Sequence, residues 1–145
     1  MKTSDQLKTD STMEAAAHEP GAPAQLAAGR AVLLVEDDRS IRRYLEVILQ
    51  KAGYTVITAS DGVEAMKIVM TTSLDAVVTD AIMPQLGGHE LCRFLRRQPK
   101  LSQLPVIILS GIENQAATIE ADGANVYLTK PVSPNVLINC LERLI

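Results

Sequence analysis

The sequence predicts an α/β domain built on one doubly wound, five-stranded parallel sheet. From Ala31 onward, apolar segments of strand length alternate five times with segments of helix length. The strand segments are almost continuously apolar, as expected when helices cover both faces of a parallel sheet. Right-handed crossovers place the helices on both faces. For five strands we expect the spatial order 2-1-3-4-5.

The expected strands are short apolar runs bounded by polar, glycine or proline residues. They are residues 31–36, 54–59, 74–79, 105–110 and 125–129. Pro105 introduces the fourth of these runs, and Asp80 directly follows the third. Each run has the length of a typical strand.

The expected helices follow the strands, at residues 40–52, 62–70, 89–97, 112–121 and 133–145. The first should bury one stripe of its surface, formed by Ile41, Leu45, Ile48 and Leu49. Gly53 is expected to end this helix, and Asp61 to cap the start of the next. The segment 112–121 has only a weak helical pattern.

The first 30 residues differ in character from the rest. They mix Ala, Pro, Gly, Ser, Thr and charged residues without sustained periodicity, which predicts a disordered tail or linker before a domain at 31–145. We expect no DNA-binding or catalytic module within the given sequence, which ends at Ile145. We therefore expect either a stand-alone domain or a piece excised from a larger protein.

Composition limits the possible partners. The chain has 145 residues, is 47% hydrophobic and carries a formal net charge of −3. Its acids and bases are interspersed, so there is neither a basic surface for nucleic acid nor a polybasic membrane patch. The apolar runs are too short to span a bilayer, and the N-terminus lacks a secretory pattern. We expect a cytoplasmic protein without direct nucleic-acid or membrane contact.

Five chemically active side chains follow the ends of different strands. Glu36 and Asp37 end the first strand, Asp80 the third, Ser110 the fourth and Lys130 the fifth. Carboxyl ends of parallel strands meet at one edge of the sheet, where ligands bind at the switch in winding direction. We expect three carboxylates, one hydroxyl and one ammonium to share that edge.

Such a cluster of acids requires a positive charge. Two carboxylates about 5 Å apart repel by roughly 3 kcal/mol at an effective dielectric constant near 20. Carboxylates that leave further positions to water and phosphate are typical ligands of Mg²⁺. Lys130 can pair with phosphate as a point charge. Asp80 could then act as a nucleophile toward a phosphoryl group and form an acyl phosphate.

Four motifs together resemble the receiver domain of two-component response regulators, of the single-domain, chemotaxis-regulator kind. They are LLVEDD, TDAIMP with Asp80, ILSG with Ser110 and YLTKP with Lys130. The similarity covers residues 31–145, with 30 residues from Asp80 to Ser110 and 20 more to Lys130. The resemblance implies a flavodoxin-like fold and a role in phosphorelay signal transduction.

The resemblance also implies a role for each site residue. Asp80 would accept phosphoryl from a histidine kinase or a histidine phosphotransfer protein. Asp37, Asp80 and the backbone carbonyl of Ile82 would bind Mg²⁺, with Glu36 acting through water. Ser110 and Lys130 would each contact a phosphoryl oxygen. The family also implies a cis Lys130–Pro131 bond.

Signal output would follow from a switch. In the family, the ring at the position of Tyr127 moves inward when the residue at Ser110 shifts toward phosphate. The output surface would comprise the segments 112–121, 125–129 and 133–145, and would bind a downstream protein or a second copy of the chain. In the last helix, Ile138 and Ile145 lie away from the stripe expected to be buried, which is Val136, Cys140, Leu141 and Leu144.

Three other functions are less consistent with these residues. A haloacid-dehalogenase-like phosphatase needs a second acid at position 82, where this chain has Ile. A flavodoxin relative needs small hydroxyl and glycine residues after the first strand, where the three acids would repel a phosphate anion. A pseudo-receiver that binds partners without phosphorylation remains the alternative. We expect phosphoacceptor chemistry rather than enzymatic turnover, and slow self-dephosphorylation because Ile82 and Ile112 would flank the phosphoryl group.

Several other polar residues are expected to have no role in the site. Asp38 should cap a helix. His89 should be solvated. A solvated helix face should hold Arg93, Arg96, Arg97 and Lys100. Cys92 and Cys140 should lie on opposite faces of the sheet, which excludes a disulfide between them within one chain.

Overall fold

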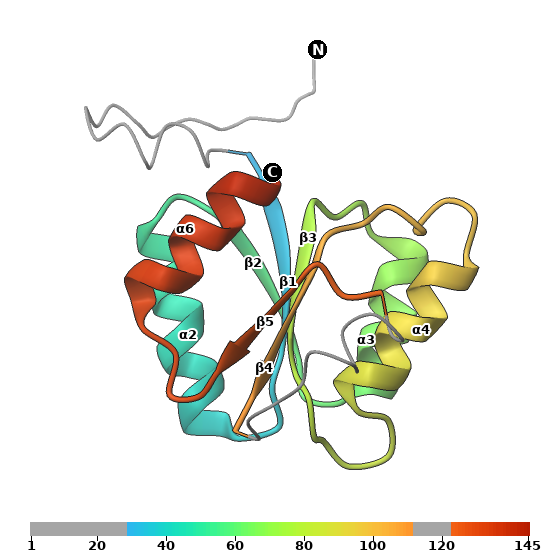
Figure 1. The fold of residues 1–145 in the computed structure, drawn as a ribbon, viewed down its shortest axis with the longest axis horizontal. Coiled ribbons are helices and arrows are strands. Elements are labelled where there is room, and N and C mark those ends of the chain that lie inside the picture. The colour runs from blue at the N-terminus through green and yellow to red at the C-terminus, as the bar shows by residue number, and fades with distance from the viewer. Residues whose placement is uncertain (1–28, 112–122) are drawn as a thin grey trace.

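The computed structural model describes residues 29–111 and 123–145, and it contains the expected parallel sheet (Figure 1). The strands are β1 (Ala31–Val35), β2 (Thr55–Ala59), β3 (Ala76–Asp80), β4 (Val106–Ser110) and β5 (Val126–Thr129). Their order is β2-β1-β3-β4-β5, with every neighbouring pair parallel, which confirms the prediction. Residues 1–28 of the tail predicted at 1–30, and the whole of the predicted helix at 112–121, lie outside the described residues.

Helices cover both faces of the sheet. They are α2 (Arg39–Lys51), α3 (Gly62–Thr71), α4 (Gly88–Arg97) and α6 (Pro134–Leu144). Figure 1 shows α2 and α6 on one face and α3 and α4 on the other. Among the helices that the structure describes, none combines the length and the apolarity needed to cross a membrane.

The helix ends follow from local chemistry. The Asp38 side chain accepts a hydrogen bond from the Ile41 amide, and the Asp61 side chain accepts one from the Glu64 amide, as predicted for N-terminal caps. Gly53, just beyond α2, has a φ of 103°, a left-handed conformation that glycine adopts without steric cost. The chain can therefore turn sharply from α2 into β2.

Two apolar cores lie on opposite sides of the sheet because neighbouring strand residues point to opposite faces. In β1, Leu33 and Val35 face α3 and α4, whereas Val32 and Leu34 face α2 and α6. The central strands β1, β3 and β4 are almost fully buried, and the edge strands β2 and β5 are only partly buried. The sheet edge that carries the site is thus held from both sides.

The two cysteines occupy different cores. Cys92 is buried in the core under α3 and α4, and Cys140 packs against the core under α2 and α6. Neither forms a disulfide. This confirms the prediction that the sheet separates them.

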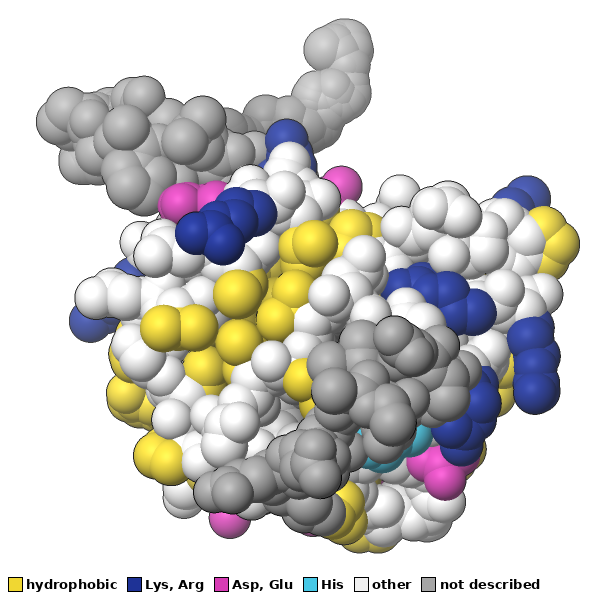
Figure 2. All heavy atoms as spheres, in the orientation of Figure 1, with side chains coloured by type: hydrophobic (Ala, Val, Ile, Leu, Met, Phe, Trp, Pro, Cys, Tyr) yellow, Lys and Arg dark blue, Asp and Glu magenta, His cyan; other side chains and the backbone are white. Residues whose placement is uncertain are grey.

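Two predicted helix stripes are rotated relative to the observed ones. In α2, Leu45 and Leu49 are buried, but Ile41 is 40% exposed. In α6, Leu137 and Leu141 are buried, whereas Val136 is 44% exposed, so its assignment to the buried stripe was wrong. Ile138 and Ile145, predicted to lie outside the buried stripe, are partly exposed and also pack in part against the same core. Figure 2 shows apolar side chains gathered over the side of the molecule that carries α6 and β5.

Arg96 has a structural role, contrary to the prediction of a solvated face. Its guanidinium donates hydrogen bonds to four oxygens, namely Gly123 O at 2.8 Å, Leu104 O at 2.8 Å, Ser102 O at 3.2 Å and Asn125 Oδ1 at 3.0 Å. Asn125 Oδ1 also accepts from the Val106 amide at 2.8 Å. Arg96 therefore ties the end of α4 to the segments that precede β4 and β5. Arg97 and Lys100 are exposed, as predicted.

Candidate functional site

The structure brings the three predicted acids together at the carboxyl edge of the sheet. Glu36 and Asp37 directly follow β1, and Asp80 is the last residue of the neighbouring strand β3. One carboxylate oxygen from each of the three lies within 4.8 Å of the others. Glu36 and Asp80 are buried, whereas Asp37 is exposed, so the cluster opens to solvent on the Asp37 side.

Glu36 is the most deeply buried acid, at 2% exposure. Its Oε2 accepts a hydrogen bond from the Asp38 amide at 3.0 Å, and its backbone carbonyl accepts one from Arg42 Nη1 at 2.8 Å. Burial is the main cause that raises the pKa of this carboxyl, and the charge of Asp80 adds to it, against the lowering effects of the Asp38 amide and Lys130. Folding therefore costs free energy if Glu36 remains ionised and unpaired.

The Glu36 carboxylate has one atom that lacks a donor. Among the described residues, Glu36 Oε1 is buried without a hydrogen-bond partner, although Lys130 Nζ lies 3.6 Å away as an ion pair. A buried polar atom without a partner is rare in native proteins. It indicates that this edge is shaped for a further positive or proton-donating group.

Asp80 is held by two donors on one of its oxygens. Lys130 Nζ lies 2.7 Å from Asp80 Oδ1, and the Ala81 amide donates to the same oxygen at 3.0 Å. Burial lowers the pKa of the Lys130 ammonium, but the hydrogen bond and charge of Asp80, together with the charge of Glu36, outweigh burial and raise it. Lys130 therefore stays a cation against the acids, and it shares Asp80 Oδ1 with the Ala81 amide.

Two further predicted residues form the rim. Ser110, the last residue of β4, is 3% exposed, and the adjoining Gly111 has open space where a side chain would stand. Ile82 is 65% exposed, two residues after Asp80. The Lys130–Pro131 peptide is cis, as the family resemblance implied. Ile112 lies outside the described residues.

Close backbone packing fixes the segment between Asp80 and α4. A Cβ atom at Gly88 would lie 2.3 Å from the Asp80 carbonyl oxygen, so only glycine fits there. The Gly88 amide donates to the Ala81 carbonyl at 2.9 Å. The first turn of α4 is therefore tied directly to the residue after Asp80.

Tyr127 on β5 contacts His89 on α4. The Tyr127 hydroxyl lies 2.6 Å from His89 Nδ1, and the ring centroids are 5.5 Å apart. Both side chains are partly buried. The expectation of a solvated His89 was therefore wrong, because the fold brings β5 beside the start of α4.

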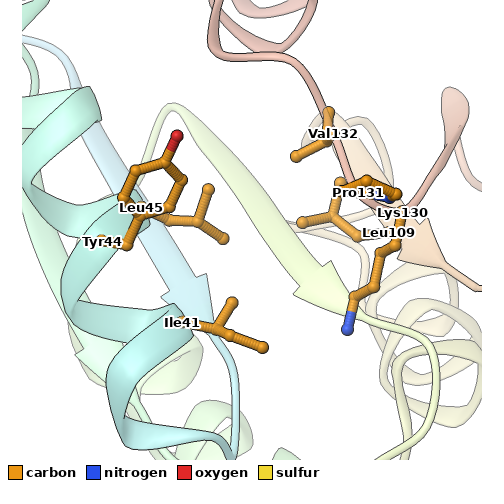
Figure 3. Close-up of a pocket in the computed structure, with 7 residues that line it drawn as sticks. All are labelled: Ile41, Tyr44, Leu45, Leu109, Lys130, Pro131 and Val132. Atoms are coloured by element: carbon orange, nitrogen blue, oxygen red, sulfur yellow. The ribbon is translucent and has the colours of Figure 1, made fainter.

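A hollow of about 420 Å³ adjoins Lys130 on the face of the sheet that α2 and α6 cover (Figure 3). Ile41, Tyr44 and Leu45 of α2 form one wall. The opposite wall is formed by Leu109, Lys130, Pro131 and Val132. Figure 3 shows the side chains of Ile41 and Lys130 extending toward one another across it. The exposed Ile41 and Tyr44 thus give an apolar border to the acidic site.

Sequence reasoning located the acids, Ser110 and Lys130, but missed two supporting residues. The sequence does not single out Arg42, and it predicts a solvated His89, whereas in the structure Arg42 binds the Glu36 carbonyl and His89 contacts Tyr127. Arg42 follows Glu36 by six residues, so one turn of helix after a cap returns its side chain to the strand end. No local signal in the sequence pairs His89 with Tyr127, which is 38 residues away.

A doubly wound five-stranded domain with three acids and a lysine at its carboxyl edge defines the CheY-like receiver class. The family model described as response regulator receiver domain matches residues 32–142. The chain belongs to this family, and is the receiver domain of a two-component response regulator.

Individual relatives agree with this assignment. The alkaline phosphatase synthesis transcriptional regulatory protein PhoP of Bacillus subtilis is 39% identical over 105 residues, which cover 71% of this chain and 43% of PhoP. A probable transcriptional regulator, ycf27 of Cyanidium caldarium, is 38% identical over 109 residues, covering 73% of this chain and 42% of its own length. The chain therefore spans less than half the length of these curated relatives.

Solved receiver structures match over nearly their full length. The chemotaxis response regulator CheY4 of Vibrio cholerae is 33% identical with a TM-score of 0.75, covering 80% of this chain and 98% of CheY4. TrrA of Thermotoga maritima, solved in complex with Mg²⁺-BeF, is 28% identical with a TM-score of 0.73, covering 80% and 99%.

Proposed function

We propose that Asp80 accepts a phosphoryl group from a histidine kinase or histidine phosphotransfer protein, with Mg²⁺ required, and that this event switches a protein-binding surface. The observation that carries the proposal is the pairing of Asp80 with Lys130 at 2.7 Å inside a cluster of three acids. Structural ion pairs rarely include two surplus carboxylates, because like charges raise the free energy of the folded state.

The acid cluster suits a hard divalent cation. The donor set is entirely oxygen, and no described residue donates a hydrogen bond to the buried Glu36 Oε1. Asp37, Asp80 and the Ile82 carbonyl would hold Mg²⁺ directly, with Glu36 acting through water. When bound, the ion neutralises charge on the phosphoryl oxygens.

The residues of the chain supply the nucleophile and its orientation. One Asp80 oxygen forms the new O–P bond while the P–N bond of the donor phosphohistidine breaks, and the electron pair of that bond returns to the imidazole nitrogen. Lys130 and the Ala81 amide hold Asp80 Oδ1, so Oδ2 is directed to the phosphorus. Lys130 and Ser110 can then each contact a phosphoryl oxygen.

The phosphoryl group is stored rather than turned over. Ile82 is exposed at the rim, and its apolar side chain cannot orient an attacking water molecule. We therefore propose a phosphoacceptor with slow self-dephosphorylation, not an enzyme that turns over substrate.

The hollow beside Lys130 is proposed as the place where the phosphodonor protein docks. A donor histidine must approach Asp80 from the open edge of the sheet, and Ile41 and Tyr44 are exposed apolar side chains that line the adjoining hollow. Tyr44→Ala should slow transfer from a protein donor and leave transfer from acetyl phosphate unchanged. Met70→Ala is the matched control, since Met70 is 58% exposed near the far end of α3.

The output is proposed to pass through Tyr127 to the surface of β5, α6 and the segment between β4 and β5. Such a switch shifts the population between two arrangements that already exist. The downstream partner would be a protein or a second copy of the chain, held by phosphorylation.

The experiment is incubation with acetyl phosphate and Mg²⁺, followed by intact-protein mass spectrometry. We expect one added phosphoryl group on the wild type, none on Asp80→Asn, and none when a chelator removes Mg²⁺. A folded wild-type protein that gains no phosphoryl group under these conditions would favour the pseudo-receiver alternative, a phosphorylation-independent interaction module.

A further inference from the structure

The contact between His89 and Tyr127 joins two elements that the sheet topology does not otherwise link. Tyr127 lies on the edge strand β5, where its partner on β4 is Ile108. His89 lies in the first turn of α4. The Tyr127 hydroxyl and His89 Nδ1 are 2.6 Å apart, which is a short hydrogen bond.

The Tyr127 ring is turned into the core rather than toward bulk solvent. It packs against the core beneath α3 and α4, and the plane of the His89 ring is tilted by 37° from its own. Since β5 is only partly buried, burial alone constrains this ring less than it would in a central strand. The hydrogen bond supplies the directional constraint that an edge strand lacks.

His89 is also close in the chain to the phosphoacceptor segment. Gly88, its neighbour, packs against the Asp80 carbonyl and donates to the Ala81 carbonyl at 2.9 Å. The Ala81 amide in turn donates to Asp80 Oδ1. The ring nitrogen that contacts Tyr127 is therefore carried by a backbone anchored at the reacting aspartate.

We propose that His89 is a positioning residue that holds the Tyr127 ring inward, against α4, before any phosphoryl group arrives. The regulatory meaning of this position rests on the proposed function, in which Tyr127 is the switch. As a consequence, the unphosphorylated protein already populates the inward Tyr127 arrangement that phosphorylation favours.

The hydrogen bond does not depend on one protonation state of His89. With a neutral ring, Tyr127 O–H can donate to Nδ1, or Nδ1–H can donate to the phenol oxygen in the other tautomer. With a protonated ring, Nδ1–H donates to the phenol oxygen. His89 can therefore hold the ring in both charge states.

The test uses the full chain with ring-¹³C-labelled tyrosine, without phosphoryl donor. The sequence has three tyrosines, so few signals need assignment, and Tyr127→Phe identifies the signal of interest. Ring exposure is measured as signal broadening by a soluble paramagnetic chelate. His89→Leu removes the hydrogen bond, His89→Asn keeps a polar atom near the position of Nδ1, and Arg97→Ala is an exposed control on the same helix.

We expect His89→Leu to lower the ratio of inward to outward Tyr127 rings by about two- to tenfold, the range for one neutral hydrogen bond. The broadening of Tyr127 should rise, while Tyr44 and Tyr54 stay unchanged. His89→Asn and Arg97→Ala should match the wild type. Identical Tyr127 broadening in wild type and His89→Leu would overturn the proposal, and so would His89→Asn behaving like His89→Leu.

Addition of Mg²⁺ with beryllium fluoride, the combination bound in TrrA, separates this proposal from the proposed function. We expect it to return the Tyr127 signal of His89→Leu toward the wild-type position. If the free-state signals differ as expected but the additive changes nothing in any variant, His89 positions Tyr127 and the phosphorylation proposal fails. If the additive shifts the site signals but the free His89→Leu protein matches the free wild type, the phosphorylation proposal stands and the positioning role of His89 fails.

Discussion

Removing one charge from the acid cluster should stabilise the metal-free protein. In Asp37→Asn, the exposed member of the cluster becomes neutral while its shape is kept. Two unit charges 4.8 Å apart repel by about 1 kcal/mol at the dielectric constant of water and about 3.5 kcal/mol at an effective value near 20. Because Asp37 is exposed, the lower figure governs, and it applies to the pairs with Glu36 and Asp80. We expect the free energy of unfolding to rise by about 1–2 kcal/mol.

The assay is urea unfolding with and without Mg²⁺. A ligand that binds only the folded state at ten times its Kd adds about 1.4 kcal/mol. The wild type should gain this increment, and Asp37→Asn should lose most of it. Asp38→Asn is the control, since it removes the neighbouring charge but keeps a side chain that can cap α2. Destabilisation of metal-free Asp37→Asn, or equal loss of the Mg²⁺ increment in both variants, would refute the reasoning.

Four more outcomes follow from the structure. The raised pKa of Glu36 means that the folded state holds its proton to higher pH than the unfolded chain. The resulting stabilisation is complete below about pH 4.5 and is lost as the pH rises through the folded-state pKa. In metal-free unfolding measured at several pH values, Glu36→Gln should reduce the dependence of the free energy of unfolding on pH. Arg96→Ala should cost about 2–3 kcal/mol in urea unfolding because four acceptors lose their donor, whereas exposed Arg97→Ala should change stability by less than about 0.5 kcal/mol. Gly88→Ala should destabilise by more than about 1 kcal/mol and reduce phosphorylation, since its Cβ would press on the Asp80 carbonyl. Ile82→Asn should shorten the lifetime of the phosphorylated form, measured by loss of the added mass; an unchanged lifetime would contradict the role given to Ile82.

The sheet and the acid cluster were predictable because they depend on local pattern and on topology. Near-continuous apolar runs fix the strands, and Asp38 and Asp61 fix the helix starts by capping chemistry. Once the order 2-1-3-4-5 is inferred, the carboxyl ends of β1, β3 and β5 must share one edge. The proximity of Asp80 and Lys130, 50 residues apart, therefore follows from the fold alone.

The supporting contacts were not predictable because they depend on side-chain direction across elements. Arg96 has the spacing of a solvated face, yet its length lets it reach carbonyls in two other segments. His89 meets Tyr127 only because α4 begins close to the edge strand. Val136 and Leu137 are adjacent apolar residues, and only the rotation of α6 on the sheet decides which is buried.

The most direct test of the central claim is chemical mapping of the phosphoryl group. Protein treated with acetyl phosphate is reduced with borohydride, which converts an aspartyl phosphate to homoserine, and its peptides are sequenced by mass spectrometry. We predict homoserine at position 80 when Mg²⁺ is present, and unmodified Asp80 when a chelator replaces it. Reduction at Asp37 to homoserine or at Glu36 to 5-hydroxynorvaline instead, or equal conversion of Asp80 without any divalent cation, would contradict the account.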